Sequence, residues 1–299
     1  MSHTEMNWSE EGLGIEFSAA RPSLLALAYR MLGDLGRAED IVQDAWVRAT
    51  PHCREIRHPK SYFIQTVTRL CLNELASARA RREEARADRL PEPVDVDQRG
   101  LGIIDSLDRI SMAFIVLLQR LSPAERAVLL LHEVFDFDHA EIATLVDKTP
   151  AACRQLLRRA RDQVTQQRRS LRVEKHEHRR LLLAFLEAAT RGDVSRLSKL
   201  LADDVVLIAD GGAEGSRYGR VRNLPGPITG SRRVAAFLAA VTAQGSDGLE
   251  IRERELNGEP AVVVFKAGAP YTAITLDVSD GAIAGIFVHA DTSRLVRLH

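Results

Sequence analysis

The chain is 299 residues long, enough for two or three domains with cores of their own. Its 41 Lys and Arg residues balance 41 Asp and Glu residues, and 45% of its residues are hydrophobic, as in ordinary soluble globular proteins. No apolar run approaches the ~20 residues that a membrane span requires, and the polar, acidic start is unlike a signal peptide, so we expect a cytoplasmic protein that makes no membrane contact.

The cysteines and the local charge pattern exclude some classes of site and favour another. Cys53, Cys71 and Cys153 are widely spaced and form no Cys-x-x-Cys pair, so we expect no metal site, cofactor or disulfide framework. Although the net charge is zero, residues 149–172 contain seven Arg and one acid, whereas residues 92–108 contain five acids and one Arg. A local basic patch is sufficient to bind phosphates.

Residues 15–50 have helical patterns. An apolar helix is predicted over residues 22–32, and Gly33-Asp34 ends it. A second helix, over residues 38–49, turns Ile41, Val42, Ala45 and Trp46 toward a core. Its outward face is polar, which by itself indicates only an acidic, solvated helix surface; it carries Glu39, Asp40, Gln43 and Asp44.

A long helix is predicted from residue 61 to residue 82. Its buried stripe includes Phe63, Val67 and Leu70, and its C-terminal end is rich in arginine, which suits the helix dipole without any ligand. Polar and aromatic side chains near its start can alternatively stack on and hydrogen-bond single-stranded bases. These are Tyr62, Gln65, Thr66 and Arg69.

Residues 83–108 form a connector. Within it, Leu90-Pro-Glu-Pro93 favours an extended, stiff segment, and the acidic run follows. The simplest interpretation of this stretch is a plain linker.

The pattern after the connector predicts helices over residues 107–119 and 123–134 and then a helix-turn-helix. Ser122 and Glu125 form a capping box, as do Asp138 and Glu141. Thr149 caps the last helix, and Pro150 occupies its first position. An Arg-rich second helix is typical of a motif that enters the DNA major groove, although a helical hairpin with a solvated basic face has the same pattern.

Beyond residue 175 the pattern becomes mixed. Helices are predicted over residues 178–190 and 234–241, and a strand over residues 205–209. Four more strands, over residues 249–256, 261–265, 272–278 and 283–288, are separated by Asn257-Gly258, Gly268 and Asp280-Gly281 turns. Helices followed by a meander of strands indicate an α+β domain.

Several of these stretches resemble a known family. Tyr29-Arg-Met-Leu-Gly-Asp34 and residues 38–46 resemble region 2 of bacterial sigma factors of the extracytoplasmic-function class. Residues 59–79 resemble the part of that region that melts DNA and recognises the minus-ten element. Residues 121–135, together with the helix-turn-helix, resemble region 4, which recognises the minus-thirty-five element.

The resemblance implies roles for individual residues. It implies docking on the clamp helices of core RNA polymerase through the four polar residues of the 38–49 helix. It implies promoter DNA contacts, with Arg159 and Arg161 on phosphates, and an acidic linker that threads toward the polymerase active-site channel. The implied DNA-binding residues are Lys60, Tyr62, Gln65, Thr66, Arg69, Asn73, Arg79, Lys148, Thr149, Arg154, Gln155, Arg158, Arg159 and Arg161.

The last domain resembles the SnoaL-like (NTF2-like) cone fold that some of these sigma factors carry. Their linker motif matches Leu90, Pro91, Glu92 and Pro93, although Arg89 stands where that family usually has Trp. Their Asp-Gly-Gly-Gly-Lys loop matches Asp210, Gly211 and Gly212, followed here by Ala213 and Glu214, and their C-terminal Asn-Pro-Asp-Lys-Leu motif is altered in residues 290–295. The resemblance implies that this loop and the linker motif regulate the protein in cis.

The sequence therefore predicts two all-α sigma domains followed by an α+β cone-shaped domain. The expected boundaries are 15–88 for region 2, 89–108 for the linker, 109–172 for region 4 and 176–299 for the SnoaL-like domain. The expected function is that of an alternative sigma factor without catalytic activity, whose partners are core RNA polymerase and promoter DNA, with a small-molecule ligand of the cone as a further expectation.

Two other functions stay open. A one-component transcription regulator would share the helix-turn-helix but would not need the polymerase-docking helix. An isomerase or cyclase would need an acid–base pocket in the cone. The candidates for that pocket are Asp204, Asp210, Tyr218, His289 and Asp291.

Overall fold

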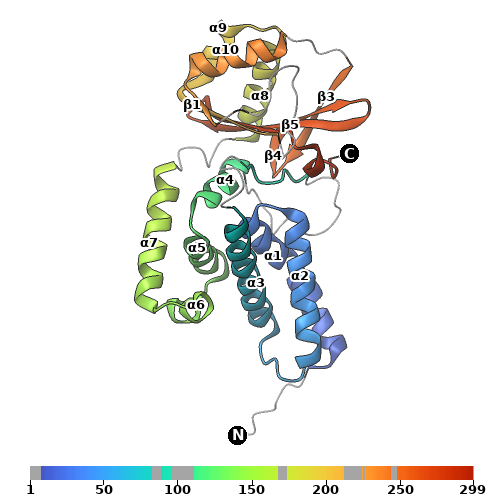
Figure 1. Ribbon diagram of the computed structural model, residues 1–299, viewed down its shortest axis with the longest axis vertical. Helices are drawn as coiled ribbons and strands as arrows, with labels where there is room; N and C mark the ends of the chain where they lie inside the picture. The colour runs from blue at the N-terminus through green and yellow to red at the C-terminus, as the bar shows by residue number, and fades with distance from the viewer. Residues whose placement is uncertain are drawn as a thin grey trace. The chain divides into compact units, whose positions relative to one another are not determined.

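The chain folds into two compact units (Figure 1). The computed structural model describes residues 8–82, 89–95, 111–167, 174–211, 224, 226–243 and 248–298. The first unit is helical, and the second contains a β-sheet with its helices, together with linker residues 89–95 and the start of one further helix. No helix in the described part of the chain is long and apolar enough to cross a bilayer.

Three helices open the first unit: α1 (Glu10–Leu32), α2 (Leu35–Ala49) and α3 (Pro59–Arg82). They share an aromatic core, in which the Phe17 ring centroid lies 5.0 Å from those of both Trp46 and Phe63. Gly33 ends α1 in the left-handed conformation (φ 67°), as its sequence position predicted.

Helix α1 is longer than the sequence predicted. It begins twelve residues earlier than expected, at Glu10, and Pro22 lies inside it. Two glycines and the proline weaken the local helical signal, but Leu13 and Ala20 continue the buried face of the helix toward Leu24. Tertiary packing thus overrides local propensity here.

Four helices follow: α4 (Met112–Arg120), α5 (Pro123–Phe135), α6 (His139–Val146) and α7 (Pro150–Gln167). Both predicted capping boxes are present, at the starts of α5 and α6. Asp136 and Asp147 end those two helices in the left-handed conformation, with φ of 55° and 52°. The predicted helix-turn-helix is therefore formed by α6 and α7.

Arg126 of α5 connects the two halves of the first unit. Its side chain is buried, and its guanidinium donates to the carbonyls of Leu118 and Leu121 and to the side-chain oxygen of Gln119. It also donates to the carbonyl of Met31, near the end of α1. One cation thus satisfies acceptors from both halves of this unit.

The second unit is built on a six-stranded sheet. It begins with α8 (Lys175–Thr190), α9 (Val194–Leu200), β1 (Leu201–Asp210) and β2 (Ile228–Thr229), followed by α10 (Ser231–Thr242). The remaining strands are β3 (Leu249–Leu256), β4 (Glu259–Lys266), β5 (Ala269–Ser279) and β6 (Ala282–His289). The strand order is β2-β1-β6-β5-β4-β3, and β1 and β6 run parallel to each other whereas the other pairs are antiparallel.

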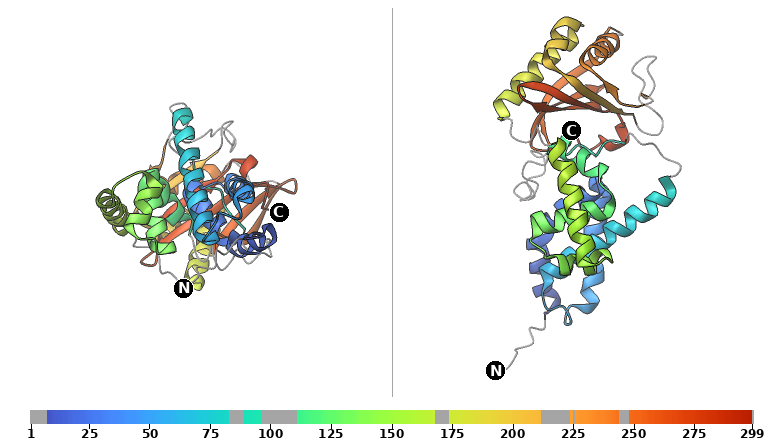
Figure 2. Two further views of the ribbon diagram at one scale, coloured as in Figure 1. Left: turned by 90° about the horizontal axis from the view of Figure 1, so that it is seen from below. Right: turned by 90° about the vertical axis from the view of Figure 1, so that its left-hand side faces the viewer.

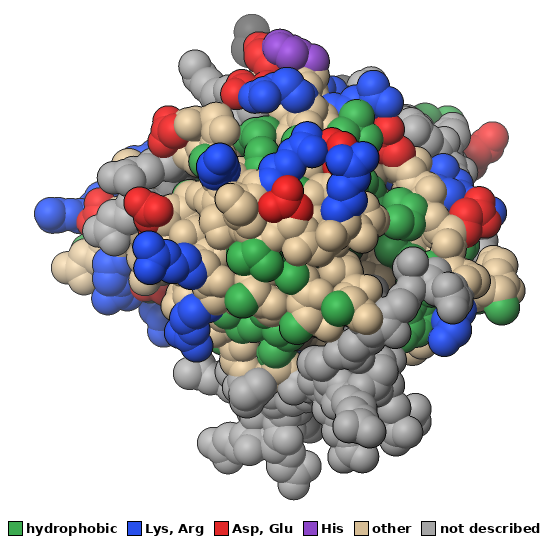
Figure 3. All heavy atoms as spheres, turned by 90° about the horizontal axis from the view of Figure 1, so that it is seen from above, with side chains coloured by type: hydrophobic (Ala, Val, Ile, Leu, Met, Phe, Trp, Pro, Cys, Tyr) green, Lys and Arg blue, Asp and Glu red, His purple; other side chains and the backbone are tan. Residues whose placement is uncertain are grey.

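The three helices of this unit cover one face of the sheet (Figures 1 and 2). Between helices and sheet lies an apolar core that includes Leu182, Phe185, Val234 and Ile286. On the face shown in Figure 3, basic, acidic and hydrophobic side chains are intermingled, a mixed surface rather than a phosphate-binding one. The short β-turns at Asn257-Gly258 and Asp280-Gly281 have positive φ at both residues, as hairpins of this kind require.

Candidate nucleic-acid interface and linker contact

Helix α7 presents an exposed polar face. Arg154, Gln155 and Arg158 are all exposed, as is Lys148 just before the helix. The Thr149 hydroxyl accepts a hydrogen bond from the backbone of Ala152 (3.2 Å), so this predicted DNA contact is also the cap of α7. The ion pair between Arg158 and Asp162 is long (4.0 Å) and solvent-exposed, and contributes little.

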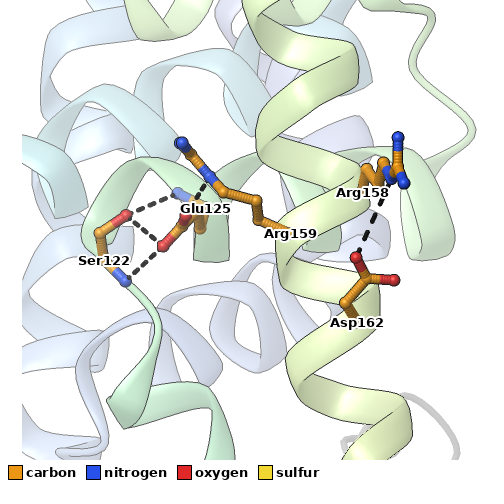
Figure 4. Close-up of polar contacts among 5 residues, drawn as sticks. All are labelled: Ser122, Glu125, Arg158, Arg159 and Asp162. Atoms are coloured by element: carbon orange, nitrogen blue, oxygen red, sulfur yellow. Dashed lines mark hydrogen bonds and ion pairs between the residues drawn. The ribbon is translucent and has the colours of Figure 1, made fainter.

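Two arginines of α7 are engaged by α5 instead. The Arg159 Nε donates to Glu125 Oε1 at 3.0 Å, and Glu125 also accepts from Ser122 in the capping box (Figure 4). Burial by itself would raise the pKa of the Glu125 carboxyl, but the Ser122 hydrogen bonds and the Arg159 charge lower it below its ordinary value. Arg161 pairs with Glu133. Both arginines therefore help to orient α7 against α5.

The predicted contacts of α3 share one side of that helix. Tyr62, Gln65, Thr66, Arg69 and Asn73 are half-buried or exposed and recur at helical spacing, opposite the buried stripe. Lys60 is exposed at the first turn, and Arg79 belongs to the last turns of the helix.

Exposed basic side chains also occur in the segment that precedes α3, to which the sequence patterns assigned no role. Its Arg54, Arg57 and His58 are exposed and adjoin Lys60, and Glu55 is the single acid among residues 50–60. This concentration of basic residues makes the short segment a candidate for contact with phosphates.

The polar face of α2 contains an apolar side chain that sequence patterning overlooked. Asp40, Gln43 and Asp44 are exposed and Glu39 is half-buried. Val47 lies on the same side, at the next position of the i, i+3, i+4, i+7 series, and 60% of it is exposed.

The linker motif is bound to the C-terminal sheet. The backbone N–H of Leu90 donates to Asp210 Oδ2 at 3.0 Å, and Arg294 donates to the Leu90 carbonyl at 2.5 Å. Arg294 also lies 3.4 Å from the same Asp210 oxygen, and both side chains are nearly buried. Three stretches that are far apart in the sequence therefore meet at one point: the linker motif, the end of β1 and the C-terminal segment.

Further contacts extend this binding along the linker. The Val94 carbonyl accepts from the backbone of Asn257 at 2.8 Å, and the Val94 N–H donates to the Asn257 side chain at 3.1 Å. Asp95 forms an antiparallel bridge with Leu256. Every residue from Leu90 to Asp95 is buried, including both acids. Of the other predicted regulatory residues, Gly211 is half-buried and Gly212 lies outside the described residues.

Among the residues that the structure describes, only Asp210 and His289 of the acid–base candidates lie directly opposite each other. Asp204 is exposed, Asp291 caps a short 3-10 helix, and Tyr218 lies outside the described residues. Asp210 and His289 are register partners on β1 and β6, and Asp210 is engaged by the linker. Burial and the Arg294 charge lower the pKa of His289 to about 3, so its imidazole is neutral at physiological pH.

Comparisons with known protein families match both sets of helices of the first unit. The family model "Sigma-70 region 2" matches residues 17–81, and "Sigma-70, region 4" matches residues 111–164. The chain is 32% identical over 287 residues to "Probable ECF RNA polymerase sigma factor SigI" of Mycobacterium tuberculosis, covering 93% of this chain and 92% of that one. The chain belongs to the extracytoplasmic-function family of RNA polymerase sigma factors.

Other members of the family resemble this sigma factor over nearly its whole length. "ECF RNA polymerase sigma factor SigJ" of M. tuberculosis is 32% identical over 290 residues, covering 91% of this chain and 89% of that one. The crystal structure of SigJ superposes with a TM-score of 0.73 at 26% identity, covering 94% of this chain and 98% of that one. The sequence-based predictions of the family, of two sigma regions and of a C-terminal α+β domain are confirmed.

Membership of the family establishes the general function. This protein is an alternative sigma factor that binds core RNA polymerase and promoter DNA and directs transcription initiation.

Proposed function

We propose that α7 recognises the minus-thirty-five element through Arg154, Gln155 and Arg158. The exposure of these three side chains on one face of a capped helix supports the proposal. Arg159 and Arg161 contribute mainly by orienting α7, because each is already paired with a glutamate of α5. Lys148 and Thr149 lie at the start of the helix, where backbone N–H groups suit a phosphate.

Replacing Arg154 or Arg158 with alanine should weaken promoter-specific transcription about tenfold or more, because a base contact made by arginine contributes about 1–3 kcal/mol of discrimination. Gel-shift titration with promoter DNA and run-off transcription measure the loss, and a pull-down checks that core polymerase is still bound. Gln163→Ala, an exposed change on the same helix, is the matched control. Normal initiation by both arginine variants would rule out this orientation of α7.

For the minus-ten element we propose the exposed side of α3 together with the basic segment before it. Tyr62 can stack on an unpaired base, and Gln65, Thr66 and Asn73 can hydrogen-bond base edges. Lys60, Arg69 and Arg79, together with Arg54, Arg57 and His58, can neutralise the backbone phosphates.

The outward face of α2 is proposed to dock on core polymerase. Val47 follows Asp40, Gln43 and Asp44 on the same side of α2, so its exposed apolar side chain adjoins these polar residues. This arrangement adds Val47 to the residues that sequence reasoning assigned to the contact.

Reversing the charge of Asp40 and Asp44 to lysine should lower the affinity for core polymerase at least tenfold, as should Val47→Ser alone. The acids contribute electrostatic complementarity, whereas Val47 contributes apolar area. Fluorescence titration with core enzyme measures both effects. Ile15→Ser is the matched control, because Ile15 is an equally exposed apolar residue, on α1. Unchanged affinity in the Val47 variant would remove that residue from the interface.

We also infer that the C-terminal domain regulates the sigma factor in cis by holding the linker. The observation that carries this inference is the meeting of Leu90, Asp210 and Arg294 at one buried point. Glu92 and Asp95 are buried in this docked form. A linker that is held in this way is not available to thread into the polymerase channel, so docking restrains initiation. Run-off transcription by variants that lack the contact tests the regulation.

Three narrower expectations accompany this function. The C-terminal domain acts without catalysis, because Asp210, the first candidate for an acid–base role, serves the linker contact. The protein works in the cytoplasm, where its polymerase is. A small-molecule ligand of the C-terminal domain stays a prediction.

A further inference from the structure

The first turn of α4 is anchored on the C-terminal sheet. Met112 is fully buried in an apolar cluster with Leu90, Ile208 and Phe287. The Ser111 hydroxyl accepts from the backbone of Phe114 at 3.1 Å and so satisfies one of the free N–H groups at the start of this helix. Because the family model for region 4 begins at residue 111, the anchored turn is the beginning of region 4.

Glu259 lies beneath this helix start. Met112 lies close enough for its backbone N–H to lower the pKa of the Glu259 carboxyl group. Its Oε2 atom is buried and has no hydrogen-bond partner among the residues that the structure describes. An ionised carboxylate in this position would keep one oxygen desolvated without compensation, which is costly, whereas a protonated carboxyl would not.

A second carboxyl group increases that cost. Ala261 of β4 pairs with Thr275 of β5, and continuing this register by two residues brings Glu259 opposite Asp277. Asp277 itself pairs with Gly285 of β6, where a Cβ would come within 2.9 Å of the Asp277 Cβ, so the two strands approach closely at this point.

The groups that face Glu259 act in opposite directions. Burial, first, and the Asp277 charge raise the pKa of Glu259 to about 8, while the Met112 hydrogen bond and Lys175 of α8 lower it. Lys175 is itself paired with Glu255 of β3 at 2.8 Å, so it compensates only weakly. The balance favours a proton on Glu259 at neutral pH.

We propose that Glu259 is a proton-dependent latch that fastens the start of region 4 to the C-terminal domain. While Glu259 carries a proton, α4 docks over it. When Glu259 ionises, the carboxylate regains water only if α4 leaves the sheet. This latch deepens the regulation in cis proposed above and rests on it for its effect on transcription, but the docking itself can be measured separately.

The direction of the pH dependence follows from linkage. The docked form raises the pKa of Glu259 above its ordinary value of 4.5, so docking takes up a proton. Docking is therefore fully stabilised below about pH 4.5 and weakens by up to about tenfold per pH unit as the pH rises toward 8, after which it stays weak.

Hydrogen–deuterium exchange of the full chain between pH 5.5 and 8.5 tests the latch. The measured exchange of residues 112–116 is expressed as protection factors, because these correct for the intrinsic pH dependence of amide exchange. In the wild type they should fall as the pH rises, by up to about tenfold per unit. In Glu259→Gln, which imitates the protonated group, they should stay high and level across the range. Asp277→Asn should lower the pKa of Glu259, so its protection factors should stop falling at a lower pH than those of the wild type.

Two further variants keep the test decisive. Asp203→Asn, an exposed change on β1, should retain the wild-type pH profile. Glu259→Lys should lose protection at every pH while thermal unfolding shows that the sheet is intact. A level wild-type profile, or an unchanged slope in Glu259→Gln, would overturn the latch. A latch that behaves as expected without any pH effect on run-off transcription would instead contradict the regulation in cis.

Discussion

Replacing Asp210 with alanine should release the linker from the C-terminal domain and raise promoter-dependent initiation several-fold. The substitution removes the acceptor of the Leu90 N–H and leaves the nearly buried Arg294 without this carboxylate. Breaking a buried charged pair from one side usually costs about 3–5 kcal/mol, which weakens the docking of the linker. Asp210→Asn, which keeps an acceptor but no charge, should have a smaller effect.

Two measurements on the same samples separate the contact from its consequence. Hydrogen exchange of residues 89–95 reports release of the linker, and run-off transcription with core polymerase reports initiation. Asp204→Ala, an exposed change on the same strand, should alter neither. A linker that stays protected in Asp210→Ala would contradict the contact. Released linker with unchanged or reduced initiation would contradict the proposed restraint.

Replacing Arg126 with methionine should destabilise the helical unit by about 3 kcal/mol or more. Methionine fills much of the same space, but it leaves the carbonyls of Leu118, Leu121 and Met31 without their buried donor. A buried acceptor that loses its partner costs about 1–3 kcal/mol, and several are affected here. Arg126→Lys should recover only part of the lost stability. An ammonium group is compact and cannot reach all the acceptors that the planar guanidinium contacts at once.

Urea unfolding followed by circular dichroism measures this loss, and the C-terminal domain serves as an internal reference because it should unfold as before. Arg21→Met, an exposed change on α1, is the matched control and should shift the transition by less than about 0.5 kcal/mol. A normal transition in Arg126→Met would mean that the guanidinium contributes little to joining the two halves of the unit.

The Arg126 contact belongs to the packing that joins the two sets of helices. Within the first unit, α5 packs directly against α1 and α3. The bond from Arg126 to Met31 adds a polar contact to this packing.

Much of this protein could be predicted from local sequence because its determinants are local. The capping boxes of α5 and α6 join residues three positions apart, and the left-handed turn at Gly33 depends on one residue. The exposed polar faces of α2, α3 and α7 follow from the helical period alone. The helix-turn-helix and the α+β character of the C-terminal domain rest on features of this kind, whereas the family was indicated by the resemblance of whole sequence motifs.

The chemistry of the linker contact could not be predicted in this way. The hydrogen bond from Leu90 to Asp210 joins residues 120 positions apart, and that from Val94 to Asn257 joins residues 163 apart. The resemblance singled out Leu90 and Asp210, but it did not reveal that they touch. Asn257 was expected only as a turn residue, and Glu259 lay outside the strand that was predicted over residues 261–265.

The sequence by itself determined most helix ends and most of the side chains that the helices expose, because caps and periodic patterns act over a few residues. The start of α1 and the exposure of Val47 were not predicted in this way. Only the tertiary structure decided that Arg159 and Arg161 pair with α5, that Arg126 joins α5 to α1, and that linker acids are buried. Such contacts depend on which surfaces the folded chain brings together. Burial then decides the charge state of a group like Glu259, which no local pattern encodes.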